Sequence, residues 1–388
     1  MKSFRVGTIS GIPIYINLTL LLFLPVIGWL ITRPDQLGFY AALVSLLSPY
    51  TIDPAALATN GGLLFVGVVG ALGLFAGVLL HELGHALTAR RFRVETSMIT
   101  LWIFGGLAHI KELPENWDAE FWIALAGPVT SVLLGVACLV SLRFVPESLP
   151  MVAFVLGWLG LVNLTLAVFN MIPAFPMDGG RILRALLARS RPYVVATSIA
   201  TSVAKVFALF MAIFGVFTFN VILVLVAMFV YVAATSESRT TVVRELLRGV
   251  KVSDLMTREV KTIDAELTIA ELVDRMLAER HTGYPVVDRD GDILGLATID
   301  HVRSVPAHER YFKSVRDVMD REPATIDADA DAFDVLMRFS ENRTNRALVT
   351  EDDRLIGIVT QTDLTEALEV IEGIRGRDPK GLARGGFA

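Results

Sequence analysis

The sequence contains few cysteines and few charges. Cys138 is the only cysteine among 388 residues, which excludes an internal disulfide framework and a cysteine-bound zinc cage. The net charge of −5 gives no electrostatic reason to expect a nucleic-acid partner. Only 19% of the residues are charged and 53% are hydrophobic, which is too apolar for an ordinary soluble enzyme of this length.

The few charges are distributed unevenly along the chain. Residues 1–235 carry 23 charged side chains, whereas residues 236–388 carry 52. This division excludes a single soluble domain, a disordered chain and a coiled coil, and it favours a membrane domain joined to a soluble one. We therefore predict a transmembrane domain over 1–235 and a charged linker over 236–249.

Long apolar runs define the spans of the first part, because a helix needs ~20 apolar residues to cross a bilayer. Six runs meet this criterion: Ile14–Ile31, Gly62–His85, Phe121–Ser141, Met151–Met171, Val195–Phe217 and Asn220–Ala234. The stretch Thr96–Ile110 alternates β-forming residues with glycines and is too short to cross, so we expect a hairpin or a re-entrant strand ending at Gly105-Gly106. The fold class is a polytopic α-helical membrane protein with a short re-entrant β element.

The cations predict the orientation. If the N-terminus is inside, ten lysines and arginines fall at cytosolic ends and only Arg33 and Arg143 at outer ends. Because positive residues stay inside, we expect a multi-pass protein of the cell membrane with both termini in the cytosol.

A metal-binding pattern ends the second run. In His81-Glu82-Leu83-Gly84-His85 two histidines one helical turn apart can bind one metal, while Glu82 faces the attacking water. The alternative is a polar helix end at the membrane surface. The spacing of Gly73, Gly77, His81 and His85 places them on one stripe, which should face the interior, where another span can supply a third ligand.

Asp178 is the candidate third ligand, because it follows an apolar run at a backbone break. Its segment, Asn170-Met-Ile-Pro-Ala-Phe-Pro-Met-Asp178-Gly-Gly180, cannot continue a regular helix. The chain must unwind there and can present the carboxylate to a cavity. Alternatively, Asp178 only caps the helix that begins near Gly180.

Together the HExxH and NxxPxxPxDG patterns resemble the site-2 protease family of intramembrane zinc metalloproteases over about residues 1–230. The resemblance implies one catalytic Zn²⁺ bound by His81, His85 and Asp178, with Glu82 as general base and Asn170 as the oxyanion donor. It further implies that a membrane-protein substrate unwinds and that the strand before Gly105-Gly106 pairs with it; a hairpin that only covers the site is the alternative. Ala126-Gly127-Pro128 also resembles the family, but Ser131 stands where many members carry asparagine, so the role of this position is open.

The soluble part contains an internal repeat. Lys251-Val-Ser-Asp-Leu-Met256 recurs as Ser314-Val-Arg-Asp-Val-Met319, and Leu294-Gly-Leu-Ala-Thr298 recurs as Ile356-Gly-Ile-Val-Thr360. The pattern resembles a tandem pair of CBS domains, a cytosolic α/β Bateman module, with repeats over 250–306 and 313–372. We expect neither repeat to be stable alone, and we expect a disordered tail over 373–388.

The CBS resemblance implies an adenine nucleotide, AMP, ADP or ATP, between the repeats. The family's GxxTxxD pattern is complete in the second repeat at Gly357, Thr360 and Asp363, whereas the first repeat has Thr298 but His301 in the acidic position. One nucleotide site is therefore better supported than two. A structural role, such as holding a homodimer together, is the alternative.

The sequence thus predicts a zinc metalloprotease that cuts transmembrane substrates in the bilayer and is regulated by its CBS pair. A CBS-regulated cation channel or transporter is the main rival, in which the histidines and Asp178 line an ion pathway. A non-catalytic adaptor is a second one. Glu82 argues against both rivals, because neither function needs a general base between two ligands.

Overall fold

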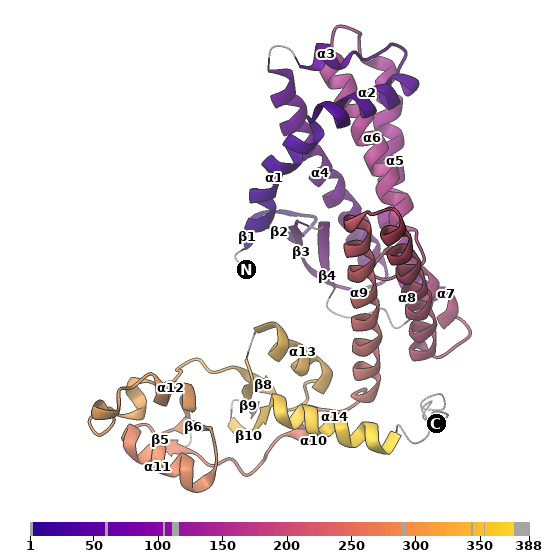
Figure 1. The fold of residues 1–388 in the computed structure, drawn as a ribbon. Coiled ribbons are helices and arrows are strands. Elements are labelled where there is room, and N and C mark those ends of the chain that lie inside the picture. Colours follow the sequence, from indigo (N-terminus) through magenta and orange to yellow (C-terminus); the bar gives the residue numbers. More distant parts are fainter. Residues whose placement is uncertain are drawn as a thin grey trace. The chain divides into compact units, whose positions relative to one another are not determined.

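The computed structural model describes residues 3–58, 61–103, 105–110, 116–288, 292–342, 344–352 and 354–375. The chain divides into two compact units, Met1–Arg239 and Thr240–Ala388 (Figure 1). Within the predicted tail, only residues up to Arg375 are described, and they belong to the last helix; residues 376–388 lie outside the described part.

The first unit is a helical bundle with one small sheet. Five of its described helices are long and apolar enough to cross a membrane: α4 (Gly62–Arg91), α5 (Trp117–Ser141), α6 (Pro150–Asn170), α8 (Tyr193–Phe217) and α9 (Val221–Leu246). The count becomes six if α1 (Leu18–Ile31) and α2 (Pro34–Leu47), bent by 70° at their junction, form one broken span. The shorter helices are α3 (Pro54–Leu57), α7 (Asp178–Ala188) and the 3-10 helix η1 (Leu142–Phe144).

The first predicted span, Ile14–Ile31, is wrong at its start. Residues Ile14 to Asn17 belong to a strand, and Asn17 caps α1 by accepting a hydrogen bond from the Thr19 amide at 3.0 Å. The remaining 14 residues of α1 are fewer than the ~20 that a bilayer requires. The apolar side chains of the strand are indistinguishable from those of a span in a hydropathy profile.

The sheet has the order β1 (Ser3–Ile9), β2 (Ile12–Asn17), β3 (Thr96–Trp102), β4 (Gly105–Ile110). β3 and β4 form the hairpin that the sequence predicts, but Gly105 and Gly106 begin β4 and do not end a strand. β2 pairs with β3 in parallel, with Ile14 opposite Ile99. Because β3 is paired on both sides, it cannot accept a further strand, and the two edges of the described sheet are β1 and β4.

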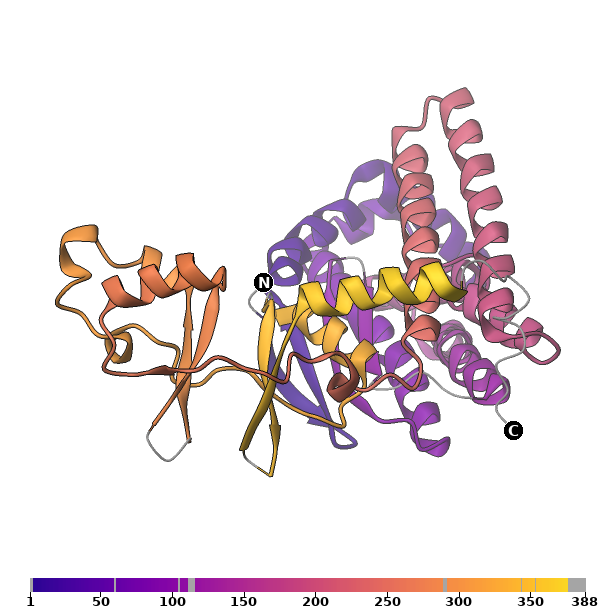
Figure 2. The same cartoon turned by 90° about the horizontal axis from the view of Figure 1, so that it is seen from below.

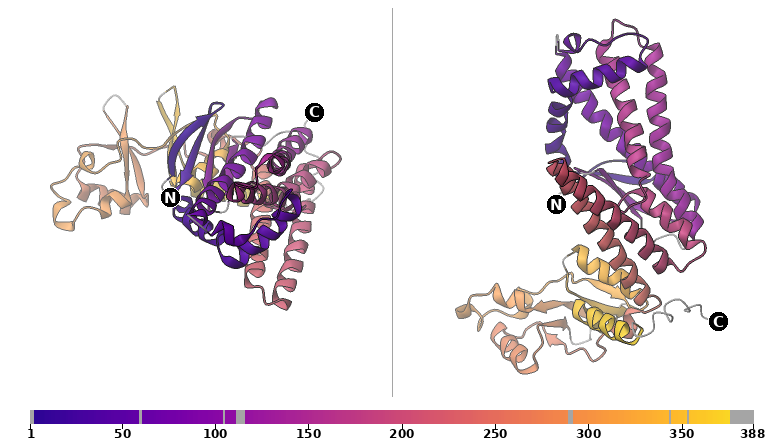
Figure 3. Two further views of the ribbon diagram at one scale, coloured as in Figure 1. Left: turned by 90° about the horizontal axis from the view of Figure 1, so that it is seen from above. Right: turned by 45° about the vertical axis from the view of Figure 1, so that its right-hand side comes forward.

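The sheet packs on the helix that carries the histidines. Leu83 and Ala86 of α4 share a buried cluster with Ile12, Ile99 and Leu101 of the strands. Figure 1 and the right-hand view of Figure 3 show the sheet beside the end of α4 that is remote from α2 and α3. The strands therefore lie beside the HExxH segment.

The second unit contains two three-stranded sheets, one for each repeat. The first repeat has the sheet β5 (Ile263–Asp264), β6 (Gly283–Val287), β7 (Ile293–Thr298), and the second has β8 (Thr325–Asp327), β9 (Arg346–Glu351), β10 (Arg354–Thr360). The helices are α10 (Val252–Leu255), α11 (Ile269–Glu279), α12 (Ile299–Arg303), α13 (Ala332–Asn342), α14 (Gln361–Arg375) and the 3-10 helices η2 (Ala307–Glu309) and η3 (Val315–Asp317). The hairpins β6–β7 and β9–β10 stand next to each other in Figure 2.

The two repeats exchange their first segments. Val252 lies in the buried core of the second repeat and its amide donates to the Ala330 carbonyl, whereas Val315 lies in the core of the first repeat. Each repeat thus completes the core of the other. The connector predicted at 236–249 is helical as far as Leu246, because α9 continues through it.

Candidate metal centre

Two buried histidines face each other across one turn of α4. The side chains of His81 and His85 are 4% and 6% exposed, and their Nε2 atoms lie 3.2 Å apart. Four residues advance an α-helix by slightly more than one turn, so both imidazoles leave the same face. That face is the small-residue stripe predicted from the sequence: a Cβ at Gly73 would contact Leu159, and one at Gly77 would contact Asn163, both on α6.

Helix α5 fixes the orientation of both rings. His85 Nδ1 lies 2.7 Å from the carbonyl oxygen of Ile123, and His81 Nδ1 lies 2.9 Å from Ser131 Oγ. A carbonyl oxygen only accepts, so Nδ1 of His85 carries a proton, and Nε2 is the ring nitrogen that a metal could bind when the ring is neutral. The position that the sequence analysis left open, Ser131, thus contacts a predicted ligand directly.

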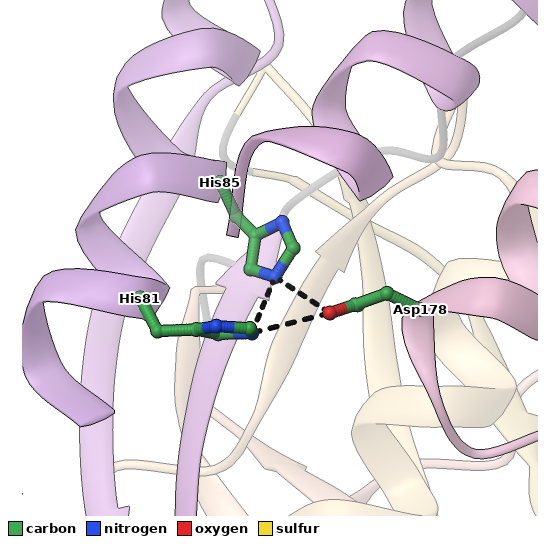
Figure 4. A group of neighbouring side chains, drawn as sticks. All are labelled: His81, His85 and Asp178. Carbon is green, nitrogen blue, oxygen red and sulfur yellow. Dashed lines mark hydrogen bonds and ion pairs between the residues drawn. The ribbon is translucent and has the colours of Figure 1, made fainter. Parts of the chain in front are cut away.

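Asp178 completes the cluster from α7. Its Oδ2 lies 3.1 Å from His81 Nε2 and 3.2 Å from His85 Nε2 (Figure 4). The residue is the first of α7, and the cap position is Met177, which makes no side-chain capping bond. The carboxylate is therefore directed at the histidines, and the capping alternative does not describe it.

The glycines after Asp178 allow this approach. A Cβ on Gly179 would collide with the carbonyl oxygens of Ile172 and Met171, and one on Gly180 would lie 2.7 Å from the Phe175 amide nitrogen. Any larger residue would push the start of α7 away from the preceding loop. The two glycines therefore place the first residue of α7 where its carboxylate reaches α4.

The three ligand atoms fit a zinc ion. Tetrahedral zinc with bonds of ~2.0–2.1 Å has its ligand atoms ~3.3–3.4 Å apart. The triangle of His81 Nε2, His85 Nε2 and Asp178 Oδ2 has sides of 3.1, 3.2 and 3.2 Å. With neutral imidazoles these are three acceptors converging in a buried site, an arrangement that a cation stabilises and that is otherwise repulsive.

Gly127 of α5 lies against the same triangle. A Cβ there would collide with Nε2 of His85 and lie 2.7 Å from Nε2 of His81. No side chain fits at this position without displacing a ligand atom. Gly127 belongs to the Ala126-Gly127-Pro128 pattern, but nothing in that pattern indicates a contact with the histidines.

Glu82 lies next to His81 in the chain, and its side chain faces β4 of the sheet. It is half-buried, and a Cβ on Gly106 of β4 would lie 2.8 Å from its Cδ. The backbone of β4 therefore approaches Glu82 closely. Asn170 is the last residue of α6 and is half-buried, and among the described residues it forms no hydrogen bond to the three ligands.

The second unit has a cavity between its repeats. Its volume is about 860 Å³, and Thr360 and Asp363 are in its wall. Asp363 Oδ2 accepts from the Thr360 amide at 2.8 Å, which leaves the other carboxylate oxygen for a ligand. Thr298 is not in the wall of this cavity; its amide donates instead to His301 Nδ1, so His301 replaces the acidic residue only as a helix cap.

Arg346 is a cation of this cavity that the sequence analysis missed. It is half-buried, donates from Nη2 to Thr282 Oγ1 at 3.2 Å, and lies in the cavity wall near Lys261 and Arg280. Burial lowers the pKa of Arg346 from its usual value, although the guanidinium stays charged. No motif marks this position. Arg346 begins β9 and pairs with Thr360 of β10 in the same repeat, and this pairing brings it to the wall that also contains Asp363.

The helices, the His-His-Asp triangle and the paired repeats define a class: a membrane metallopeptidase with a tandem CBS module. The sequence model of peptidase family M50 matches residues 69–154 and 146–214, and that of the CBS domain matches 252–308 and 315–370.

Known proteins resemble the chain over nearly its full length. Zinc metalloprotease MJ0392 of Methanocaldococcus jannaschii is 34% identical over 370 residues, covering 95% of this chain and 97% of that protein. Rip3 of Mycobacterium tuberculosis is 32% identical over 389 residues, covering 94% and 92%. The solved structure of the site-2 protease from Methanocaldococcus jannaschii is 36% identical and covers 61% of this chain and 96% of its own, with a TM-score of 0.41. The chain belongs to peptidase family M50, the site-2 protease family, and is a metallopeptidase.

Proposed function

We propose that the chain is an intramembrane zinc metalloprotease that cuts transmembrane segments of membrane proteins. One observation carries the proposal: three buried donor atoms from α4 and α7 form a triangle of the size of one face of a tetrahedral zinc site. A relative that is similar over its whole length is named a zinc metalloprotease.

The chemistry divides among five residues. His81, His85 and Asp178 would hold a zinc ion, and the ion would supply Lewis-acid activation of the scissile carbonyl and of water. Glu82 takes the proton of the attacking water and returns it to the leaving amine. The amide of Asn170 donates to the developing oxyanion, for which an NH₂ group is a suitable donor.

The substrate adds to the sheet edge. Of the two edge strands, β1 and β4, it is β4 whose residue Gly106 lies against Glu82, so an extended peptide paired with β4 would pass beside the general base. Main-chain pairing of this kind requires an unwound segment and imposes little sequence preference. We infer that the β element is re-entrant and that Gly105 and Gly106 contact the substrate.

Orientation follows from the positive-inside rule, which supports a cytosolic location for both termini and the CBS pair. The metal site then lies near the cytosolic ends of its helices, and a short channel brings water to it. The protein is thus a multi-pass protein of the cell membrane, surrounded by lipid.

The CBS cavity binds an adenine nucleotide that modulates proteolysis. Asp363 accepts from a ribose hydroxyl, Thr360 lies beside it, and Arg346 faces the phosphates. Regulation requires that the nucleotide favour one arrangement of the module, because a ligand that binds all arrangements equally shifts nothing. Dimerisation through the module is compatible with this role.

The decisive experiment is co-expression with a panel of single-span membrane proteins. We expect a cleaved product with the native enzyme and none with Glu82→Gln; Glu147→Gln, an exposed loop carboxylate, is the matched control. Purified Glu82→Gln should retain zinc, whereas His81→Ala, His85→Ala and Asp178→Ala should lose it. Cation flux that depends on the ligands, with no Glu82-dependent cleavage, would favour the channel or transporter.

A further inference from the structure

A buried arginine joins three helices next to the metal site. Arg184 of α7 is 1% exposed and is the largest fully buried side chain among the described residues. Its Nε donates to Oε1 of Glu120 on α5 at 2.7 Å, and its Nη1 donates to Oε1 of Glu237 on α9 at 2.5 Å. The guanidinium also lies over the rings of Phe175 and Tyr193, at 5.0 and 4.9 Å from their centroids.

Stability alone is a poor explanation for this cluster. Burying charges costs several kcal/mol per ion before attraction offsets it, and hydrophobic replacements of buried ion pairs are often as stable. Oε2 of Glu120 is buried without a hydrogen-bond partner in the described part of the chain, which adds to the cost. An arginine fork, however, fixes geometry well because its donors lie in one rigid plane.

The geometry that it fixes is that of α7. Asp178 is the first residue of this 11-residue helix, and Arg184 lies six residues later. Six residues correspond to ~9 Å of a rigid helix, so a rotation or slide of α7 at Arg184 is transmitted to Asp178. Anchoring Arg184 therefore sets where the Asp178 carboxylate lies.

The anchor is on the same helix face that orients the histidines. Glu120, Ile123, Gly127 and Ser131 of α5 follow one another at intervals of three, four and four residues, which is one stripe of an α-helix. Ile123 holds His85, Ser131 holds His81, and Glu120 holds Arg184. One face of α5 thus contacts His81 and His85 directly and holds Asp178 indirectly, through Arg184.

We propose that Arg184 is a positioning residue for the third metal ligand, Asp178. Its bond to Glu120 of α5 fixes the position of α7 relative to the two histidines, and its bond to Glu237 makes that position depend on α9 as well. The proposal rests on the function proposed above. Glu237 follows the apolar part of α9, and its side chain is 32% exposed, so this bond is the more accessible half of the anchor.

The test measures zinc retention by the purified full-length protein against a series of chelator concentrations. Loss of an outer partner of a metal ligand typically weakens metal binding by ~10- to 100-fold, and we expect Arg184→Lys, which keeps the charge but not the fork, to fall in this range. Glu237→Ala should weaken it by roughly 3- to 10-fold, the effect of one lost hydrogen bond. Arg189→Lys, on the exposed end of the same helix, is the matched control and should behave as the native protein.

Activity supplies a second readout. A displaced ligand lowers zinc affinity, so excess zinc should restore proteolysis to Arg184→Lys; a general folding defect would not be rescued. Native zinc retention by both Arg184→Lys and Glu237→Ala overturns this inference while leaving the proposed function intact. If Arg184→Lys does not fold, the result for Glu237→Ala decides. A native protein whose zinc binding does not depend on His81, His85 and Asp178 fails the proposed function itself.

Discussion

The most direct test of the metal centre is to add one methyl group at position 127 by the substitution Gly127→Ala. The Cβ of Gly127→Ala would collide with Nε2 of His85 and lie 2.7 Å from Nε2 of His81. Carbon and nitrogen atoms in ordinary contact are ~3.5–4.0 Å apart, so at least one ring must move by about an ångström. Both rings are held by α5 itself, and therefore cannot retreat without breaking their hydrogen bonds.

The expected magnitude follows from the loss of a ligand. Disturbing a partner that only orients a ligand costs ~10- to 100-fold in metal affinity. Moving the ligand itself should reach at least the upper limit, ~100-fold or about 2.7 kcal/mol. Alanine is the better helix former by up to ~1 kcal/mol, so the variant should remain folded although it has lost metal.

The assay is zinc content of the purified protein over a range of chelator concentrations, together with thermal unfolding. Gly38→Ala is the matched control, because Gly38 lies in a helix and a Cβ there meets nothing within 4 Å. Native zinc affinity in Gly127→Ala would refute the argument that the ligand triangle is packed against α5.

Three further predictions concern other parts of the chain. Ser131→Ala should lower zinc affinity by ~10-fold with Ser141→Ala unchanged, because only Ser131 holds His81; equal affinities in zinc titrations of the two variants would remove Ser131 from the site. Single cysteines at the exposed positions Gln36 and Arg189, in a background lacking Cys138, should react with an impermeant reagent from opposite sides of the membrane, and labelling of position 189 in intact cells would reverse the topology. Asp363→Asn keeps an acceptor for the Thr360 amide but loses the charge, so AMP or ATP binding should weaken by roughly 10- to 150-fold in calorimetry on the full-length protein. His301→Ala is the control and should change the affinity little. No binding at millimolar nucleotide would leave the CBS pair as a structural element.

The sequence predicts the spans well where hydropathy alone decides. α4, α5, α6, α8 and α9 all fall on predicted apolar runs, because a bilayer imposes a minimum length that few other structures need. It fails at Ile14, where a buried strand and a membrane helix share the same composition. The partner of that strand is Ile99, 85 residues later, and no local pattern records such a pairing.

The candidate site shows a similar limit. The spacing of His81 and His85 fixes their common face, and the breaks around Asp178 mark it as the candidate third ligand, so the converging donors could be predicted. The contacts with α5 that orient these donor groups could not be predicted. The approach of β4 to Glu82 depends on how the sheet packs on α4, and the sequence gives no sign that Gly106 lies against that carboxylate. The place of Arg346 in the cavity wall depends on the pairing of β9 with β10, which no motif marks.

Helix α5 shows why the missing information matters for the chemistry. The residues of its stripe act through different groups: Glu120 through its charge, Ile123 through its main-chain carbonyl, Gly127 through its lack of a side chain and Ser131 through its hydroxyl. No single sequence motif includes all four. Each makes sense only against a different partner on α4 or α7. A metal site tolerates little error in ligand position, so a helix that contributes no ligand can still control the occupancy of the site. Mutational scans restricted to the HExxH and Asp178 segments would therefore miss the helix that contacts all three predicted ligands or their anchors.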